Sequence, residues 1–237
     1  MNEVLRQEKK FLISLEQYYR YSHHLAAALH MDAHSHGEGY LIRSLYFDTL
    51  DDKDFEDKED GVELRRKIRL RNYGADNDFA VLEMKQKQGA MQKKRSLRLN
   101  RDEARRLTRG DYAPLLAHKE PFAAECFALM NAQCYRPKAV ITYHRKAFVA
   151  KENKIRITFD HHITGSESCF DIFSPSLVEN PILDPCLVVL EVKFNGFLLG
   201  YIKDMLEIAH RRFGAVEPGH FPFLPLHAQR HGLQPQV

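Results

Sequence analysis

Alternation of side-chain character along short segments is the feature that most constrains what this chain can fold into. Along residues 62–73 one set of alternate positions is polar and mostly cationic. It consists of Glu63, Arg65, Lys67, Arg69, Arg71 and Tyr73. The other set contains Val62, Leu64, Ile68 and Leu70 and is apolar apart from Arg66 and Asn72. Because a period of two places successive side chains on opposite faces of a β-strand, this segment predicts a strand with a cationic face and a core face.

The same alternation occurs in eight segments, which we expect to be strands. They lie at about residues 5–13, 41–48, 62–73, 79–88, 93–99, 138–149, 153–160 and 186–194. Short connections rich in Gly, Asn and Asp predict hairpins between several of them. Helices are expected from Ser14 to about Leu29 and after Asn100, both with capping-box spacing, and near 119–132 and 196–212. The acidic run at 51–57 is interpreted as a solvated connection, and Phe11, Tyr46 and Phe47 as packing residues.

Cationic faces recur along the chain. Besides residues 65–71, the charged positions are Lys85 and Lys87 beside Glu83, Arg145 beside Tyr143, Arg156, and Lys193 beside Glu191. A solvated face explains any single amphipathic strand, but like charges opposite one another on paired strands repel, so repetition indicates an anion that neutralises them. Phosphate fits, because arginine offers it a planar fork and lysine a point charge. With helices covering the apolar faces, the charged faces would converge in the lumen of an eight-stranded antiparallel barrel, which is wide enough for a phosphate chain.

Glu8, Glu83 and Glu191 lie among these cations and fit two interpretations. Each could be an ion-pair partner. Each could also hold Mg²⁺ or Mn²⁺, because these metals take one or two carboxylates together with phosphate oxygens.

Length and composition are compatible with one large domain, since 44% of the 237 residues are hydrophobic. We expect this domain at residues 1–217 and a C-terminal tail at 218–237. No apolar run approaches the roughly 18 residues that span a bilayer, and the start is charged, so a cytoplasmic protein without a membrane segment is expected. Nucleic acid is not expected as a partner, because aromatic residues are not interleaved with the cations. A partner protein is left open.

Seven short motifs occur in an order that resembles a known family. They are RQEKKF at 6–11, RSLYFDT at 43–49, RKIRLRNY at 66–73, LEMK at 82–85, YHR at 143–145, IRITFD at 155–160 and LEVKF at 190–194. Their types and order resemble the VTC domain, the catalytic module of the vacuolar transporter chaperone polyphosphate polymerase and of its bacterial relatives. The resemblance extends over about residues 4–210.

The resemblance implies the triphosphate tunnel fold of the CYTH-like triphosphate tunnel metalloenzymes, an α+β fold in which helices pack outside an eight-stranded antiparallel barrel. It also implies metal-dependent transfer of the γ-phosphate of ATP to a growing polyphosphate chain, with Mn²⁺ or Mg²⁺. The implied basic ligands of the phosphates are Lys10, Lys58, Arg69, Arg71, Lys85, Lys93, Arg95, Arg145 and Arg156. Tyr143 matches a phosphate-contacting tyrosine and Glu191 a metal-binding glutamate.

Within this set, the residues expected to act on the reacting phosphates are Arg69, Arg71, Lys85, Arg145 and Arg156. The charged faces add Lys67, Lys87 and Lys193 as further phosphate contacts. The chain departs from the family pattern at 218–223, where PGHFPF stands in place of a Ser-Lys pair between aromatic residues.

Two alternatives remain beside the polymerase. The first is hydrolysis of inorganic or nucleoside triphosphate, as in CYTH enzymes, which open with Glu-x-Glu-x-Lys. Here Arg6 precedes Glu8 and Lys10, which favours the polymerase. The second is a non-catalytic module that binds polyphosphate or inositol phosphates with strong salt dependence and no turnover.

Overall fold

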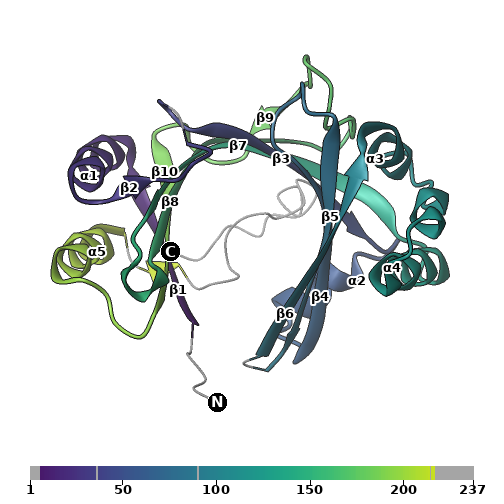
Figure 1. Ribbon diagram of the computed structural model, residues 1–237, viewed down its shortest axis with the longest axis horizontal. Coiled ribbons are helices and arrows are strands. Elements are labelled where there is room, and N and C mark those ends of the chain that lie inside the picture. The colour runs from purple at the N-terminus through teal and green to yellow at the C-terminus, as the bar shows by residue number, and fades with distance from the viewer. Residues whose placement is uncertain (1–5, 36, 90, 214, 217–237) are drawn as a thin grey trace. The chain divides into compact units, whose positions relative to one another are not determined.

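The computed structural model of the chain describes residues 6–35, 37–89, 91–213 and 215–216 (Figure 1). These residues group into two compact units. The first contains the described parts of Met1–Leu41, Tyr143–Thr164 and Pro181–Phe223, and the second those of Ile42–Thr142 and Gly165–Asn180. The expected tail at 218–237, with the departure at 218–223, lies outside the described residues.

The described strands belong to one sheet. They are β1 (Arg6–Ser14), β2 (His30–Met31), β3 (Tyr40–Asp48), β4 (Leu64–Asn72), β5 (Phe79–Gln88), β6 (Met91–Asn100), β7 (Arg136–Val149), β8 (Arg156–Ser166), β9 (Asn180–Pro181), β10 (Leu187–Asn195) and β11 (Ala215–Val216). The hydrogen-bonded order is β11-β1-β10-β8-β7-β3-β4-β5-β6, with β2 beside β7 and β9 beside β8. The pairs with a defined register are antiparallel.

The expected eight-stranded barrel is corrected in two respects. In the described residues the sheet has eleven strands. The three that were not predicted, β2, β9 and β11, are each two residues long, which is too short for alternation to reveal them. In the part of the chain that the structure describes, the sheet is not closed, because β11 and β6 end the order and do not pair with each other. A mostly antiparallel sheet with helices, of class α+β, is confirmed.

The helices are α1 (Leu15–Ala28), α2 (Lys53–Glu59), α3 (Arg101–Leu107), α4 (Pro121–Ala132) and α5 (Gly200–Phe213), with the 3₁₀ turns η1 (Ala113–Ala117) and η2 (Glu152–Lys154). Both predicted capping boxes are confirmed. Ser14 accepts a hydrogen bond from the backbone N–H of Gln17 at 3.2 Å, and Asn100 from that of Glu103 at 2.9 Å. None of the helices described is long and apolar enough to cross a membrane.

The acidic run at 51–57 contains α2 and is not simply a solvated connection. Asp48 accepts hydrogen bonds from the backbone N–H groups of Asp54 and Phe55 at 2.9 Å, so a carboxylate upstream of the helix satisfies its first turn. Asp54 itself is buried and accepts a hydrogen bond from the Tyr135 hydroxyl at 2.7 Å. This small helix thereby connects the end of β3 to the segment before β7.

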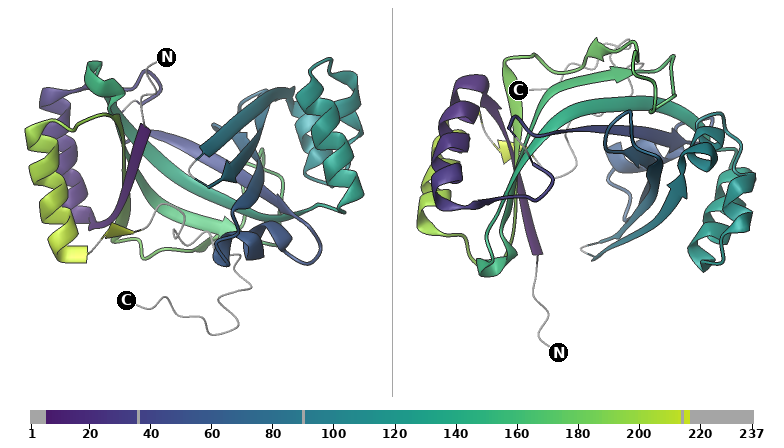
Figure 2. Two further views of the ribbon diagram at one scale, coloured as in Figure 1. Left: turned by 90° about the horizontal axis from the view of Figure 1, so that it is seen from below. Right: turned by 45° about the horizontal axis from the view of Figure 1, so that its top comes forward.

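In the first unit, α1 and α5 cover one face of β1, β8 and β10 (Figures 1 and 2). Ile13, Phe159 and Leu190 from these strands pack with Tyr18 and Ile202 from the helices, and all five are buried. Alternate positions of the same strands therefore project on the face that these helices leave uncovered.

In the second unit, α3 and α4 cover β4, β5 and β6 in the same way (Figure 2). Ile68, Leu82 and Leu97 pack with Ala104 and Met130 in a separate core. Each unit thus confirms, taken by itself, the expectation that helices cover the apolar face of the strands and leave the charged face uncovered.

Candidate functional site

The uncovered face of β4, β5 and β6 in the second unit is rich in cations, and we call it the cation ladder. Its cations are Arg65, Lys67, Arg69, Arg71, Lys85, Lys87, Lys94 and Arg98. Lys67 is the direct partner of Lys85, and Lys85 of Lys94, so three ammonium groups occupy one row across the strands. Like charges in direct register repel, so this face gains from binding an anion.

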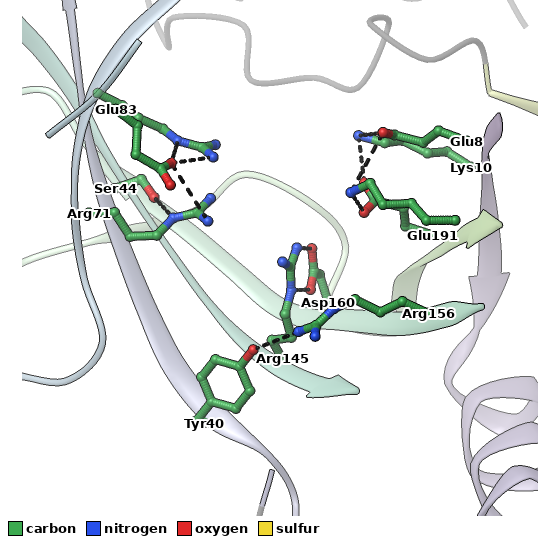
Figure 3. A network of polar contacts seen from close by, with 12 residues as sticks. Glu8, Lys10, Tyr40, Ser44, Arg71, Glu83, Arg145, Arg156, Asp160 and Glu191 are labelled. Carbon is green, nitrogen blue, oxygen red and sulfur yellow. Dashed lines mark hydrogen bonds and ion pairs between the residues drawn. The ribbon is translucent and has the colours of Figure 1, made fainter. Parts of the chain in front are cut away.

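Among the described residues of β4–β6, Glu83 is the carboxylate on the same face as the ladder cations. Its relative exposure is 3%. Its Oε2 lies 2.7 Å from Nε and 2.6 Å from Nη2 of Arg69. Arg71 Nη1 lies 3.9 Å from the same oxygen (Figure 3). Lys94 pairs with Oε1. Burial by itself would raise the pKa of Glu83, but Arg69, Arg71 and Lys94 lower it to about 2. Glu83 is therefore ionised and holds both guanidinium groups in place.

Tyr46 and Ser44 of β3 extend the ladder to a fourth strand. Tyr46 is the register partner of Arg69, and Ser44 that of Arg71. Arg69 Nη1 donates to the Tyr46 hydroxyl at 3.5 Å, and Arg71 Nε donates to Ser44 Oγ at 3.3 Å. Lys67 Nζ lies 4.3 Å from the centroid of the Tyr46 ring. The interpretation of Tyr46 as a packing residue is therefore corrected: its ring and hydroxyl contact cations of the ladder.

In the first unit, we call the uncovered face of β1, β10, β8 and β7 the paired face. Four of its cations, Lys10, Lys193, Arg145 and Arg156, each contact a carboxylate. Lys10 Nζ lies 3.1 Å from Glu191 Oε2 and 3.4 Å from Glu8 Oε1. Lys193 contacts the same two carboxylates, at 3.6 Å for Glu8 Oε2 (Figure 3). Burial would raise the pKa of Glu191, but Lys10, Lys193 and Arg145 lower it well below its usual range.

Two arginines complete the paired face. Arg145 forms a bidentate pair with Asp160, with Nε to Oδ1 and Nη2 to Oδ2 both at 2.6 Å, and its guanidinium carbon lies 5.2 Å from the Tyr143 ring centroid. Arg156 pairs with Asp32 through Nη1 and donates to the Tyr40 hydroxyl at 3.4 Å through Nη2 (Figure 3). Such bidentate and shared contacts fix the guanidinium planes without a ligand.

The structure divides the predicted site residues into three sets. The ladder contains Arg69, Arg71, Lys85, Lys67 and Lys87. The paired face carries Lys10, Tyr143, Arg145, Arg156, Lys193, Glu8 and Glu191. Three predicted phosphate ligands, Lys58, Lys93 and Arg95, lie on neither face.

Lys93 and Arg95 are on the helix-covered face of β6, because Arg95 is the partner of Met84, which is in the core. There Arg95 Nη2 lies 2.6 Å from Glu125 Oε1 of α4. Lys58 is on α2, where its Nζ lies 2.5 Å from Glu59 Oε1.

The predicted metal ligands are divided as well. Glu83 lies in the second unit, where both of its carboxylate oxygens contact cations. Glu8 and Glu191 lie in the first unit, where both contact Lys10 and Lys193. Among the residues described, no group of three or more His, Cys, Asp or Glu gathers as a metal site. The pair Glu8 and Glu191 nevertheless fits Mg²⁺ or Mn²⁺, since these metals need one or two carboxylates when phosphate supplies further oxygens.

Comparison with known proteins gives the family. A putative adenylate cyclase from Bacillus halodurans shares the fold, with a TM-score of 0.50, 15% sequence identity and coverage of 87% of this chain and 90% of that one. A conserved hypothetical protein from Pyrococcus furiosus aligns with a TM-score of 0.36, 10% identity and coverage of 87% and 88%. No curated protein sequence matches the chain. The family model described as VTC domain matches residues 5–213. The chain therefore belongs to the VTC domain family.

Proposed function

We propose that this chain is a polyphosphate polymerase, which transfers the γ-phosphate of ATP to a growing polyphosphate chain. The observation that carries the proposal is the row Lys67, Lys85 and Lys94 on the cation ladder. The like charges of this row repel one another, and a polyanion that lies along it relieves this repulsion. Membership of the VTC domain family supports the same conclusion.

On the ladder, Arg69 and Arg71 bind phosphate oxygens through their planar guanidinium groups. Glu83 keeps both groups oriented, so less side-chain entropy is lost when phosphate arrives. Lys67, Lys85 and Lys87 add point charges along the strands, which suits a chain of evenly spaced phosphates.

On the paired face, Arg145 and Arg156 contact phosphate while Asp160 and Asp32 hold them. Glu191 and Glu8 would hold Mn²⁺ or Mg²⁺, and the metal when bound neutralises charge on phosphate oxygens. Lys10 and Lys193, which contact these carboxylates in the structure, are then available to phosphate.

The chemistry asks for positioning and charge neutralisation. The terminal phosphate of the acceptor chain supplies the attacking oxygen, which forms a bond to the γ-phosphorus, and the bond from that phosphorus to the β–γ bridging oxygen breaks to release ADP. The attacking oxygen is already anionic, so no catalytic base is assigned. Cationic side chains that are held in place before the reaction stabilise the charge of the transition state.

Incubation of the protein with ATP and Mn²⁺, followed by separation of the products by length, tests the proposal. Long phosphate chains with release of ADP support it. Orthophosphate without chains would instead indicate a triphosphate hydrolase, and tight salt-sensitive binding of polyphosphate without ATP turnover would indicate a binding module.

A further inference from the structure

Cationic side chains of β4 surround the side chain of Tyr46 on β3. Its register partner on β4 is Arg69, whose Nη1 donates to the Tyr46 hydroxyl at 3.5 Å. Lys67 Nζ lies 4.3 Å from the ring centroid. Arg71, the next cation on the same face of β4, donates to Ser44, which precedes Tyr46 on the same face of β3. The phenol oxygen therefore lies among the cations to which we assign phosphate binding.

Several strands near Tyr46 carry charged groups, and on β5 the nearest row includes Lys85, the register partner of Lys67. On β4 they are Lys67, Arg69 and Arg71. Beyond them on β5 and β6, Glu83 is paired with Arg69 and Lys94. On β7, the other neighbour of β3, Lys138 Nζ lies 2.9 Å from Asp52 Oδ1, and Arg136 Nη1 donates to the Tyr135 carbonyl at 2.7 Å. The cations whose charges act on the Tyr46 hydroxyl include Lys67, Arg69 and Arg71 of β4.

We propose that Tyr46 is a proton-linked phosphate ligand: its hydroxyl takes up a proton when a polyphosphate anion binds the cation ladder, and then donates a hydrogen bond to a phosphate oxygen. The inference rests on the proposed function in that the ladder binds polyphosphate. The proton comes from the solvent and forms the phenol O–H bond, and no other bond is made or broken.

Proton uptake is expected because the phosphate replaces the Tyr46 phenolate as the negative charge among the cations. Without ligand, burial would raise the pKa of Tyr46, but Lys67, Arg69 and Arg71 lower it to about 7, so the phenolate supplies negative charge among the cations. When phosphate oxygens supply that charge, the phenolate is repelled by them and its protonated form is favoured. The hydroxyl then acts as a donor towards phosphate, as the arginines do.

The test uses the full chain, inorganic tripolyphosphate without metal, and the variant Tyr46→Phe. This variant keeps the ring beneath Lys67 and removes the hydroxyl. Tyr19→Phe is the matched control, because Tyr19 is 56% exposed on α1 in the other unit. Ultraviolet difference absorption of phenolate follows the titration, and calorimetry in two buffers of different protonation enthalpy measures proton uptake on binding.

In the wild type and in Tyr19→Phe, we expect a phenolate signal that appears near neutral pH and disappears on addition of tripolyphosphate at pH 8. Tyr46→Phe should lack this signal and should take up roughly nine-tenths of a proton less per bound tripolyphosphate at that pH. Above neutral pH the wild type should lose affinity relative to Tyr46→Phe, by up to about tenfold per pH unit.

Two results would overturn the inference in different ways. Binding of tripolyphosphate with equal proton uptake by the wild type and Tyr46→Phe would remove Tyr46 from the ligand set and leave the proposed function intact. No binding of tripolyphosphate by the wild type would refute phosphate binding itself, and with it both proposals.

Discussion

Replacement of Glu83 by glutamine tests whether the ladder is held together by one buried carboxylate. Glu83→Gln keeps the shape of the side chain and removes its charge, so Arg69, Arg71 and Lys94 lose their shared partner. Removal of one member of a buried charged cluster leaves the others without compensation. We therefore expect the variant to be less stable than the wild type in the absence of ligand.

The magnitude follows from the pKa of Glu83, which the three cations lower, against the effect of burial, from an ordinary 4.5 to about 2. At about 1.4 kcal/mol per pH unit, this difference corresponds to about 3 kcal/mol of folding free energy. Because the pKa is lowered in the folded state, this stabilisation is fully present above pH 4.5 and is lost as the pH falls towards 2. At pH 7, Glu83→Gln should therefore lower the free energy of unfolding by about 3 kcal/mol.

Urea denaturation at pH 7 and low salt, followed by circular dichroism, measures this change. Glu125→Gln is the matched control, because Glu125 pairs with Arg95 on the other face of β6 and its side chain is 45% exposed. That exposed pair should contribute less than about 1 kcal/mol. Tripolyphosphate should stabilise Glu83→Gln more than the wild type, because it supplies the missing negative charge. Equal losses in the two variants, or a smaller ligand effect in Glu83→Gln, would refute this account of the ladder.

Three further changes have defined outcomes. Arg69→Ala should abolish ATP turnover while the far-ultraviolet circular dichroism spectrum is unchanged, because Arg71 and Lys94 still neutralise Glu83. Glu191→Gln should lower the Mn²⁺-dependent initial rate by roughly a hundredfold or more, measured in a Mn²⁺ titration. Gly39→Ala should lower the midpoint of thermal unfolding, because φ is +109° and a Cβ would lie 2.3 Å from the carbonyl oxygen of Arg145.

Matched controls give these predictions their contrast. Arg106→Ala changes an exposed arginine paired with Asp111 and should leave turnover intact. Gly110→Ala places a Cβ at φ +79° with no heavy atom within 4 Å, so its loss should be smaller than that of Gly39→Ala. Wild-type turnover in Arg69→Ala would exclude that arginine from the site. An unchanged Mn²⁺ titration in Glu191→Gln would exclude Glu191 from metal binding. Equal decreases in the midpoint of thermal unfolding for Gly39→Ala and Gly110→Ala would contradict the close contact at Gly39.

Alternation predicted correctly which side chains share a face of a strand. Lys67, Arg69 and Arg71 lie opposite Ile68 and Leu70 because an extended backbone turns successive side chains by half a turn. This rule is local, so it holds wherever the strand is regular. It fails at residues 93–95, where three consecutive cations carry no alternation and the register with Met84 decides that Arg95 faces the helices.

Turn residues predicted the hairpins β4-β5, β5-β6 and β7-β8, and the sheet order confirms them, but the pairing of strands with longer connections was beyond the reach of local patterns. Tyr46 and Arg69 are neighbours through the register of β3 with β4, which depends on the whole connection between them, including the unforeseen helix α2. The start of β8 was also predicted incorrectly: the alternation suggested residue 153, whereas the strand begins at Arg156. Asn153 and Lys154 have φ of +52° and +48°, so the turn after β7 continues through both residues.

The two faces differ in charge balance, and under the proposed function this difference gives them different ligands. On the paired face, Lys10, Lys193, Arg145 and Arg156 all have carboxylate partners, so a phosphate that displaces a carboxylate leaves that carboxylate in need of a cation, which a divalent metal provides. On the ladder, the cations outnumber Glu83, so an anion would bind there without such a requirement. Loss of a carboxylate therefore has opposite consequences for ligand binding: Glu83→Gln should increase the demand of the ladder for an anion, whereas Glu191→Gln should remove the means of holding a metal.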